Sequence, residues 1–238
     1  MAPERPVLAV GDIHGCARPF TTLLDRYTRL QEDPRLAGLA LVLLGDMVDR
    51  GPDSRAVLIR ARDMTRAMPE DVICLTGNHE LMLLDFIDDP LGRGLRWLAF
   101  GGAETLSSFD IPPPSHKKDP DRIMAVADQL EQALRAEGLL DWLRVLPDRW
   151  STGNLACVHA AMAPDQPLDR QNRRHLCWGH PDFARQPRTD GLWVVHGHTI
   201  SPKPICAVGR IALDTGAFQG GPLSAALLTP GQCRFLQV

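Results

Sequence analysis

The chain has 238 residues and carries a formal net charge of −3. This balance lacks the basic surface of nucleic-acid-binding domains, so we expect no nucleic-acid partner. The longest apolar stretch, Leu36–Leu44, is too short to cross a bilayer, and the N-terminus has no signal-peptide pattern. None of the six cysteines stands in a Cys-x-x-Cys pair, so neither a zinc knuckle nor a dithiol motif is indicated. We therefore expect a cytoplasmic protein with reduced thiols and no membrane partner.

In chain order, five short apolar runs predict buried strands, because continuous apolar residues are typical of strands covered on both faces. After each of the first three runs, apolar residues at helical spacing predict a helix: over Phe20–Leu30, from Pro52–Ser54 onward, and over Leu81–Phe86. This alternation indicates a parallel sheet with crossover helices. The runs are Val7–Val10, Leu41–Leu44, Val72–Leu75, Leu155–Val158 and Leu192–Val195.

The middle and the end of the chain break this rhythm. Residues 111–120 are rich in proline and predict a loop, and the spacing from Ile123 to Leu134 predicts an amphipathic helix. A second loop, residues 164–190, is expected to carry short helical turns and to border the functional site that the motifs described below indicate. Four short strands at the end predict an antiparallel meander. They are Ile205–Val208, Arg210–Leu213, Leu223–Leu228 and Cys233–Val238.

Polar motifs follow the predicted strands directly. Gly-Asp-Ile-His-Gly occupies residues 11–15, Gly-Asp-Met-Val-Asp-Arg-Gly occupies residues 45–51, and Gly-Asn-His-Glu occupies residues 77–80, while two later strands lead into His159 and His198. Side chains at the carboxyl ends of parallel strands converge on one edge of a sheet. Each residue alone has a simpler explanation, such as a surface turn, a helix cap or a buried histidine. Five strand ends that carry such residues together favour a shared site.

Carboxylate, amide and imidazole groups in this combination suit Mn²⁺, Fe²⁺ or Zn²⁺ better than Ca²⁺ or Mg²⁺. They are more numerous than one catalytic ion needs. We therefore expect two ions that share one carboxylate, activate a water molecule and hold the oxygens of an in-line displacement. The candidate ligands are Asp12, His14, Asp46, Asn78, His159 and His198.

Three further residues of these motifs are candidates for handling a phosphate group. The forked guanidinium of Arg50 matches phosphate oxygens. His79 follows the candidate ligand Asn78 and, if the backbone there is extended, points away from the metal ions and is free to protonate a leaving oxygen. Asp49 is a partner that would keep this imidazole charged and oriented.

The motifs closely resemble those of the PPP-type phosphatases of the calcineurin-like metallophosphoesterase superfamily, above all its compact bacterial members. The resemblance covers nearly the whole chain, including Trp97-Leu98 with Gly101-Gly102 and the stretch Leu213–Ala217. It implies one catalytic domain over residues 1–238. The implied fold class is α/β, a four-layer α/β/β/α sandwich of two mixed sheets with the metal ions at the strand ends.

The resemblance also assigns roles to the site residues. Asp12 and His14 would bind the first metal ion, and Asp46 would bridge both ions. The second ion would be bound by Asn78, His159 and His198. His79, supported by Asp49, would be the general acid, Arg50 would hold the phosphate, and Glu80 would support the motif from behind. His196 is interpreted as packing at a strand end.

Two departures from the family pattern affect substrate binding. Bacterial relatives usually carry Trp-x-Arg in the later loop, where the arginine makes a second phosphate contact, but this chain has Trp178-Gly179-His180. Either His180 or a nearby loop arginine, with Arg185 the nearest, would then supply the second cation. The tyrosine that eukaryotic members carry after a late strand is absent from Asp214–Gly216, so their sensitivity to toxins is not expected.

The favoured function is a phosphomonoesterase with two divalent metal ions, Mn²⁺ in first place and Fe²⁺ or Zn²⁺ as alternatives. It would be a serine/threonine protein phosphatase in which a metal-bridging water or hydroxide attacks phosphorus directly. Its partner would be a phosphorylated protein or a small phosphate ester. One alternative is a symmetrical diadenosine-tetraphosphate hydrolase, although those enzymes typically have alanine at the place of Asp49. Another is a catalytically weakened phosphate-binding or scaffolding protein, which only His180 supports.

Overall fold

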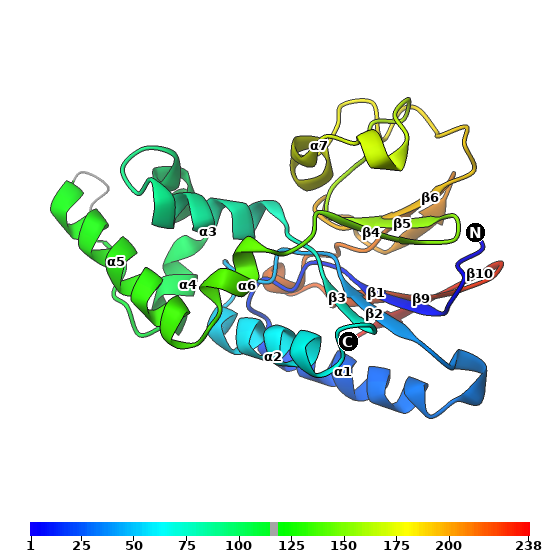
Figure 1. Ribbon diagram of the computed structural model, residues 1–238, viewed down its shortest axis with the longest axis horizontal. Coiled ribbons are helices and arrows are strands. Elements are labelled where there is room, and N and C mark those ends of the chain that lie inside the picture. Colours follow the sequence, from blue (N-terminus) through cyan, green and yellow to red (C-terminus); the bar gives the residue numbers. More distant parts are fainter. Residues whose placement is uncertain (115–118) are drawn as a thin grey trace.

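Two five-stranded mixed sheets face each other in the computed structural model, which describes residues 1–114 and 119–238 (Figure 1). The first sheet has the strand order β10-β9-β1-β2-β3, and the second has the order β4-β5-β6-β8-β7. The strands of the first sheet are β1 (Val7–Val10), β2 (Ala40–Leu43), β3 (Val72–Cys74), β9 (Ser224–Thr229) and β10 (Gln232–Gln237). Those of the second are β4 (Arg149–Thr152), β5 (Leu155–Val158), β6 (Trp193–His196), β7 (Ile205–Ala207) and β8 (Arg210–Ala212).

Helices cover the outer faces of both sheets. Strands β1, β2 and β3 are parallel, and the crossover helices α1 (Ala17–Gln31) and α2 (Ser54–Ala67) that connect them lie on one outer face (Figure 1). The short helix α7 (Arg173–Trp178) lies on the outer face of the second sheet (Figure 1). The predicted α/β/β/α sandwich of two mixed sheets is therefore confirmed.

Alternate residues of the central strands enter different apolar clusters, which is why the strands read as continuous apolar runs. In β1, Leu8 and Val10 pack toward α1 and α2, whereas Val7 and Ala9 pack between the two sheets. In β5, Leu155 and Cys157 lie between the sheets, and the residues that alternate with them pack toward α7. Because the strands are packed on both faces, the motifs at their ends are held in fixed positions.

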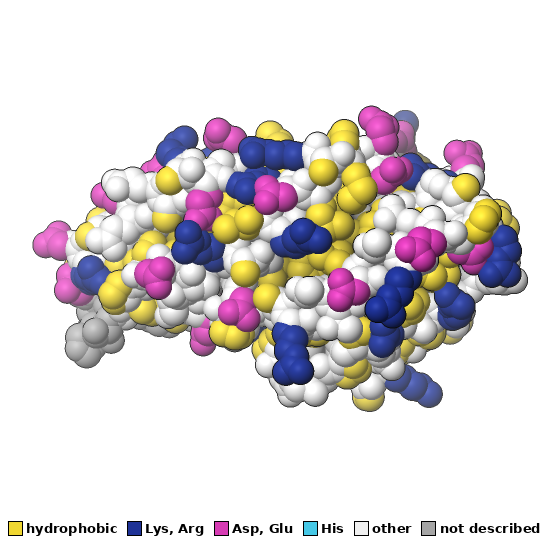
Figure 2. Space-filling view, turned by 90° about the horizontal axis from the view of Figure 1, so that it is seen from below, with side chains coloured by type: hydrophobic (Ala, Val, Ile, Leu, Met, Phe, Trp, Pro, Cys, Tyr) yellow, Lys and Arg dark blue, Asp and Glu magenta, His cyan; other side chains and the backbone are white. Residues whose placement is uncertain are grey.

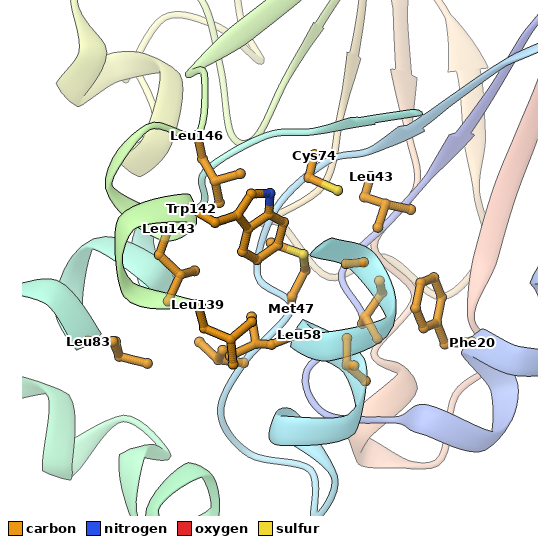
Figure 3. Packing of buried hydrophobic residues seen from close by; sticks show 14 of the residues in the cluster. Phe20, Leu43, Met47, Leu58, Cys74, Leu83, Leu139, Trp142, Leu143 and Leu146 are labelled. Carbon is orange, nitrogen blue, oxygen red and sulfur yellow. The ribbon is translucent and has the colours of Figure 1, made fainter. Parts of the chain in front are cut away.

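A group of helices follows β3 and packs beside the first sheet (Figure 1). It consists of α3 (Asn78–Asp88), the 3₁₀ helix η2 (Arg93–Ala99), α4 (Gly102–Ser108), α5 (Pro120–Ala136) and α6 (Leu140–Arg144). Helix α5 confirms the predicted amphipathic helix, while residues 115–118 of the predicted 111–120 loop lie outside the described residues. In Figure 3, the Trp142 ring of α6 lies next to Met47 and Cys74. Met47 directly follows Asp46, so this packing anchors the second motif in the core.

The described residues also form three short 3₁₀ helices: η1 (Pro34–Leu36), η3 (Leu168–Arg170) and η4 (Ala217–Gln219). Together with α7, η3 supplies the short turns expected within residues 164–190.

The predicted antiparallel meander at the end of the chain is wrong. Strands β7 and β8 form a hairpin in the second sheet, where β8 pairs parallel with β6, whereas β9 and β10 form a hairpin in the first sheet, where β9 pairs antiparallel with β1. The segment between β8 and β9 crosses from one sheet to the other. Strand β4, which pairs with β5, was not predicted. Alternation identifies strands but carries no information on which distant strand becomes the neighbour.

Basic and acidic side chains are interspersed on the face that Figure 2 shows, and apolar side chains gather between them, so this face has no patch of a single sign. Among the described residues, no helix is long and apolar enough to cross a membrane.

Candidate metal centre

Histidine and carboxylate side chains from both sheets meet at one end of the sandwich. The ligand atoms of His14, Asp46 and His79 lie within 4.8 Å of one another, and so do those of Asp46, His159 and His198. Asp46 belongs to both groups. It follows β2 in the first sheet, whereas His159 and His198 follow β5 and β6 in the second. The carboxyl ends of the two sheets therefore share one polar cluster, as the strand-end argument predicts.

The two oxygens of Asp46 face different partners. Oδ1 lies 3.4 Å from Nε2 of His159, while Oδ2 lies 3.6 Å from Nε2 of His14 and 3.9 Å from Nε2 of His79. A carboxylate between two sets of donors is the arrangement that two metal ions sharing one ligand require.

Backbone carbonyls set the tautomers of two histidines. Nδ1 of His14 lies 2.8 Å from the carbonyl oxygen of Val48, and Nδ1 of His159 lies 3.0 Å from that of Leu44. A carbonyl only accepts, so each Nδ1 donates, and in the neutral imidazole each Nε2 carries the lone pair that a metal ion would take. Nε2 of His159 also lies 2.9 Å from Oδ1 of Asn78.

The buried carboxylates of this cluster are stabilised by a nearby positive charge. Burial alone would lower the pKa of His159, but the neighbouring carboxylates, Asp46 foremost and then Asp12 and Glu80, together outweigh it and raise the pKa to about 10. A proton is thus held at His159, whereas burial lowers the pKa of His14 to about 3 and that of His198 to about 4, so these two imidazoles are neutral. Metal binding would displace the proton of His159. Nitrogen and oxygen donors without thiolates suit a catalytic divalent ion rather than a structural zinc. The residues present therefore fit the expected pair of metal ions.

Asp12 lies beside the cluster but outside both groups. Its two oxygens accept the backbone N–H of His198 at 3.1 and 3.0 Å, and a side chain at Gly197 would overlap this carboxylate. Burial, followed by the neighbouring Asp214 carboxylate, raises the pKa of Asp12 well above its ordinary value. The structure thus couples the first motif to the His198 loop, and the role of Asp12 as a metal ligand stays a prediction.

His79 is held by a buried carboxylate. Its Nδ1 lies 2.7 Å from Oδ2 of Asp49, which also accepts Nε1–H of Trp97 at 2.9 Å and, through Oδ1, the hydroxyl of Thr105 at 2.7 Å. Burial lowers the pKa of His79, but the carboxylates of Asp46 and Asp49 outweigh it, so the pKa is raised. This arrangement favours a protonated imidazole. The sequence indicates Trp97 only through the family resemblance, and it gives no signal for Thr105.

The premise that the backbone is extended at His79 is wrong. Helix α3 starts at Asn78, not at Leu81, because the Glu80 side chain reaches back to the N–H of Gly77 at 2.7 Å. Asn78 and His79 still point in different directions, but the reason is that they are successive residues on the first turn of a helix.

Glu80 fixes the second motif from behind. Its Oε2 accepts the backbone N–H of Asp46 at 2.9 Å, and its Oε1 accepts those of Met47 and Val48 at 2.7 and 3.3 Å. Since the carboxylate is fully buried, these bonds bind the loop after β2 to the start of α3.

Unusual backbone conformations concentrate in this cluster. Among the described residues, seven non-glycine residues have positive φ, and five of them are candidate site residues: His14, Asp46, Asp49, Arg50 and His198. Side chains other than glycine rarely adopt this region, and folded proteins retain such strain mainly where a function depends on it.

Arg50 lies at the edge of the cluster. Its Nη1 is 3.3 Å from Nε2 of His14, and its guanidinium stacks on the Phe218 ring, 4.5 Å from the centroid. Phe218 also packs edge-on against His14, with ring centroids 5.0 Å apart. Phe218 was not predicted, although it directly follows the Leu213–Ala217 stretch that carried the resemblance.

Two further candidates, His180 and Arg185, lie on the segment between β5 and β6. His180 packs edge-on against His175 and accepts the backbone N–H of Asp182, while the Arg185 side chain is exposed. Within the described residues, neither makes a hydrogen bond or ion pair to the cluster, so their phosphate-binding roles stay predictions. His196 is buried and packs edge-on against Phe183 at 5.0 Å, in agreement with a packing role.

Comparison with known proteins agrees with this geometry. A family model described as calcineurin-like phosphoesterase matches residues 5–202. An asymmetrical bis(5'-nucleosyl)-tetraphosphatase of Geobacillus thermodenitrificans is 27% identical over 91% of this chain and 87% of its own length. Serine/threonine-protein phosphatase 1 of Salmonella typhimurium is 26% identical over 93% of this chain and 91% of its own length.

The fold is also found among solved structures. A crystal structure assigned as a diadenosine tetraphosphatase superposes with a TM-score of 0.63 and 23% identity, covering 99% of this chain and 95% of that one. The matched family model, which spans most of the chain, shows that the chain belongs to the calcineurin-like phosphoesterase family, whose members use divalent metal ions, and the structural likeness agrees in fold.

Proposed function

We propose that the protein hydrolyses a phosphate ester or phosphoanhydride bond at a centre of two divalent metal ions. The observation that carries this proposal is the Asp46 carboxylate, whose two oxygens face two separate groups of histidines. Bound there, two ions would lower the pKa of a water molecule and neutralise charge on the reacting phosphate. Asp46, His14, His159 and His198 would hold them, together with Asp12 and Asn78.

The remaining side chains would act on the substrate. Arg50 would bind a phosphate oxygen, and its stacking on Phe218 would limit the orientations of its guanidinium. His79 would deliver the proton on Nε2 to the leaving oxygen, because its Nδ1 is engaged by Asp49. Asp49 would in turn be oriented by Trp97 and Thr105.

The first candidate substrate is a dinucleoside polyphosphate. The tetraphosphatase of Geobacillus thermodenitrificans, matched over 91% of this chain, supports it, as does the 34% identity to a symmetrical tetraphosphatase of Aromatoleum aromaticum over 66% of the chain. From the sequence, Asp49 favoured a protein phosphatase over a dinucleoside-polyphosphate hydrolase, and the comparisons favour the opposite order. A protein phosphatase is the second candidate, favoured by the Asp49–His79 pair and by the Salmonella phosphatase.

A substrate panel tests both candidates. The protein would be loaded with Mn²⁺, Fe²⁺ or Zn²⁺ and assayed on diadenosine tetraphosphate, a phosphoserine peptide and p-nitrophenyl phosphate, with Asp46→Asn as the inactive control. Chromatography of the nucleotide products separates symmetrical cleavage, which yields two ADP, from asymmetrical cleavage, which yields AMP and ATP. Absence of turnover on all three substrates with every metal would refute the proposal and favour a phosphate-binding protein.

A further inference from the structure

An arginine that the sequence motifs do not include is stacked between two aromatic rings. The guanidinium of Arg96, on η2, lies 4.3 Å from the ring centroid of Trp178 and 5.2 Å from that of Phe100. The side chain is exposed, and within the described residues it has no ion pair or hydrogen bond. Arg93 on the same 3₁₀ helix differs, because its Nη1 lies 2.8 Å from Oδ1 of Asp85.

The two aromatic residues belong to segments that are hydrogen-bonded to two different parts of the metal centre. Phe100 precedes Gly101, whose carbonyl accepts the backbone N–H of Arg50 at 3.2 Å. Trp178 ends α7, where the carbonyl of Leu176 accepts the backbone N–H of Ala160 at 2.6 Å, directly after His159. Arg96 therefore connects the Arg50 side of the cluster to the His159 side.

This placement leaves a cation available for a ligand. Stacked rings hold the guanidinium plane while its N–H fork stays free, and a guanidinium sheds water more readily than an ammonium. The fork matches a phosphate group in two-bond geometry. Phe100 is 45% exposed, so its ring is also open for stacking by a nucleobase.

We propose that Arg96, held by Phe100 and Trp178, binds a phosphate group of the substrate other than the one attacked, so that the centre prefers nucleoside polyphosphates to phosphomonoesters. The inference rests on the proposed phosphoesterase function, because it adds a second anion subsite to the same centre. Arg50 would serve the attacked phosphate, and a chain of phosphates would extend from there toward Arg96. Arg96 would then be the second phosphate-binding cation, the role for which the sequence suggested either His180 or Arg185.

Matched variants test the subsite. Arg96→Gln removes the charge and keeps a polar side chain, and Arg93→Gln makes the same change at an arginine that is already paired with Asp85. In the Mn²⁺-loaded enzyme, Arg96→Gln is expected to raise KM for diadenosine tetraphosphate about tenfold more than KM for p-nitrophenyl phosphate, the change that loss of one charge-assisted hydrogen bond produces. Arg93→Gln is expected to keep the parent ratio of the two KM values, and Arg96→Lys to fall between the parent and Arg96→Gln.

Calorimetric titration with inorganic tripolyphosphate gives a readout that does not depend on turnover, and Arg96→Gln is expected to weaken its binding. An equal rise of KM for both substrates, unchanged tripolyphosphate affinity, or a larger loss on a phosphoserine peptide than on the dinucleotide would overturn the assignment. If the parent hydrolyses none of these substrates, the proposed function fails. The titration then decides the subsite alone, because binding that Arg96→Gln weakens supports it and equal binding overturns it.

Discussion

Replacing Glu80 by glutamine should destabilise the fold, because this one side chain connects two motifs through four backbone donors. Oε2 accepts the N–H groups of Asp46 and Gly77 at 2.9 and 2.7 Å, and Oε1 accepts those of Met47 and Val48 at 2.7 and 3.3 Å. Glutamine offers a single acceptor oxygen, so it keeps one pair of bonds. Its NH₂ group then faces the other two N–H groups, which are buried and left without an acceptor.

The size of the effect follows from these contacts. Hydrogen bonds to a charged acceptor contribute about 1.5–3 kcal/mol each, so losing two costs about 3–6 kcal/mol. Burial and the neighbouring Asp46 raise the pKa of Glu80, which means that its charge is itself costly, and glutamine removes that cost. We therefore expect the lower end of the range, about 3 kcal/mol, still a large part of the roughly 5–15 kcal/mol that stabilises a typical domain.

Urea unfolding of the metal-free protein measures this difference. Glu104→Gln is the matched control, since Glu104 is an exposed residue of α4, and it should change the free energy of unfolding by no more than about 0.5 kcal/mol. Glu80→Gln should also bind metal more weakly, because Asp46 is no longer fixed. A Glu80→Gln protein as stable as the control would refute the argument, since it would mean that the loop donors are satisfied without the carboxylate.

Four further outcomes are expected. Asp46→Asn should lower the number of bound metal ions and abolish turnover, and metal analysis that finds two ions with near-normal activity would contradict the bridging role. His79→Asn should keep both metals and lower kcat by about 10²–10⁴-fold, with a smaller loss for p-nitrophenyl phosphate, whose leaving group needs less protonation, so an equal loss on an alkyl phosphate argues against the general acid. Burial lowers the pKa of His196 from 6.5 in the unfolded chain to about 4, so its contribution to stability is present above pH 6.5 and lost as pH falls toward 4. His196→Gln should remove about 3 kcal/mol of this pH dependence in urea unfolding, and an unchanged profile would refute it. Chelation of the metal ions should lower Tm and abolish activity. Mn²⁺ at 100 times its Kd should restore about 2.7 kcal/mol of stability per site. An equal Tm with and without Mn²⁺ would show that no ion binds the folded protein preferentially.

Local sequence determined much of the scaffold and the chemistry of the site. A continuous apolar run such as Val7–Val10 predicts a strand that is buried on both faces, because alternate residues of a strand point to opposite faces. The strand-end rule predicts that His159 and His198, which follow neighbouring parallel strands, lie close together, and they do; Asp46 joins them because the two sheets face each other.

Tertiary structure alone decided which distant segments became neighbours. Trp97 and Thr105 lie 48 and 56 residues from Asp49, yet both donate to its carboxylate. The backbone of His198 bonds to Asp12 across 186 residues, and Phe218 reaches the site only through packing. The C-terminal strands divided between two sheets for the same reason. Periodicity and turn chemistry act over a few residues, whereas the choice of partner depends on how whole layers bury their apolar faces together.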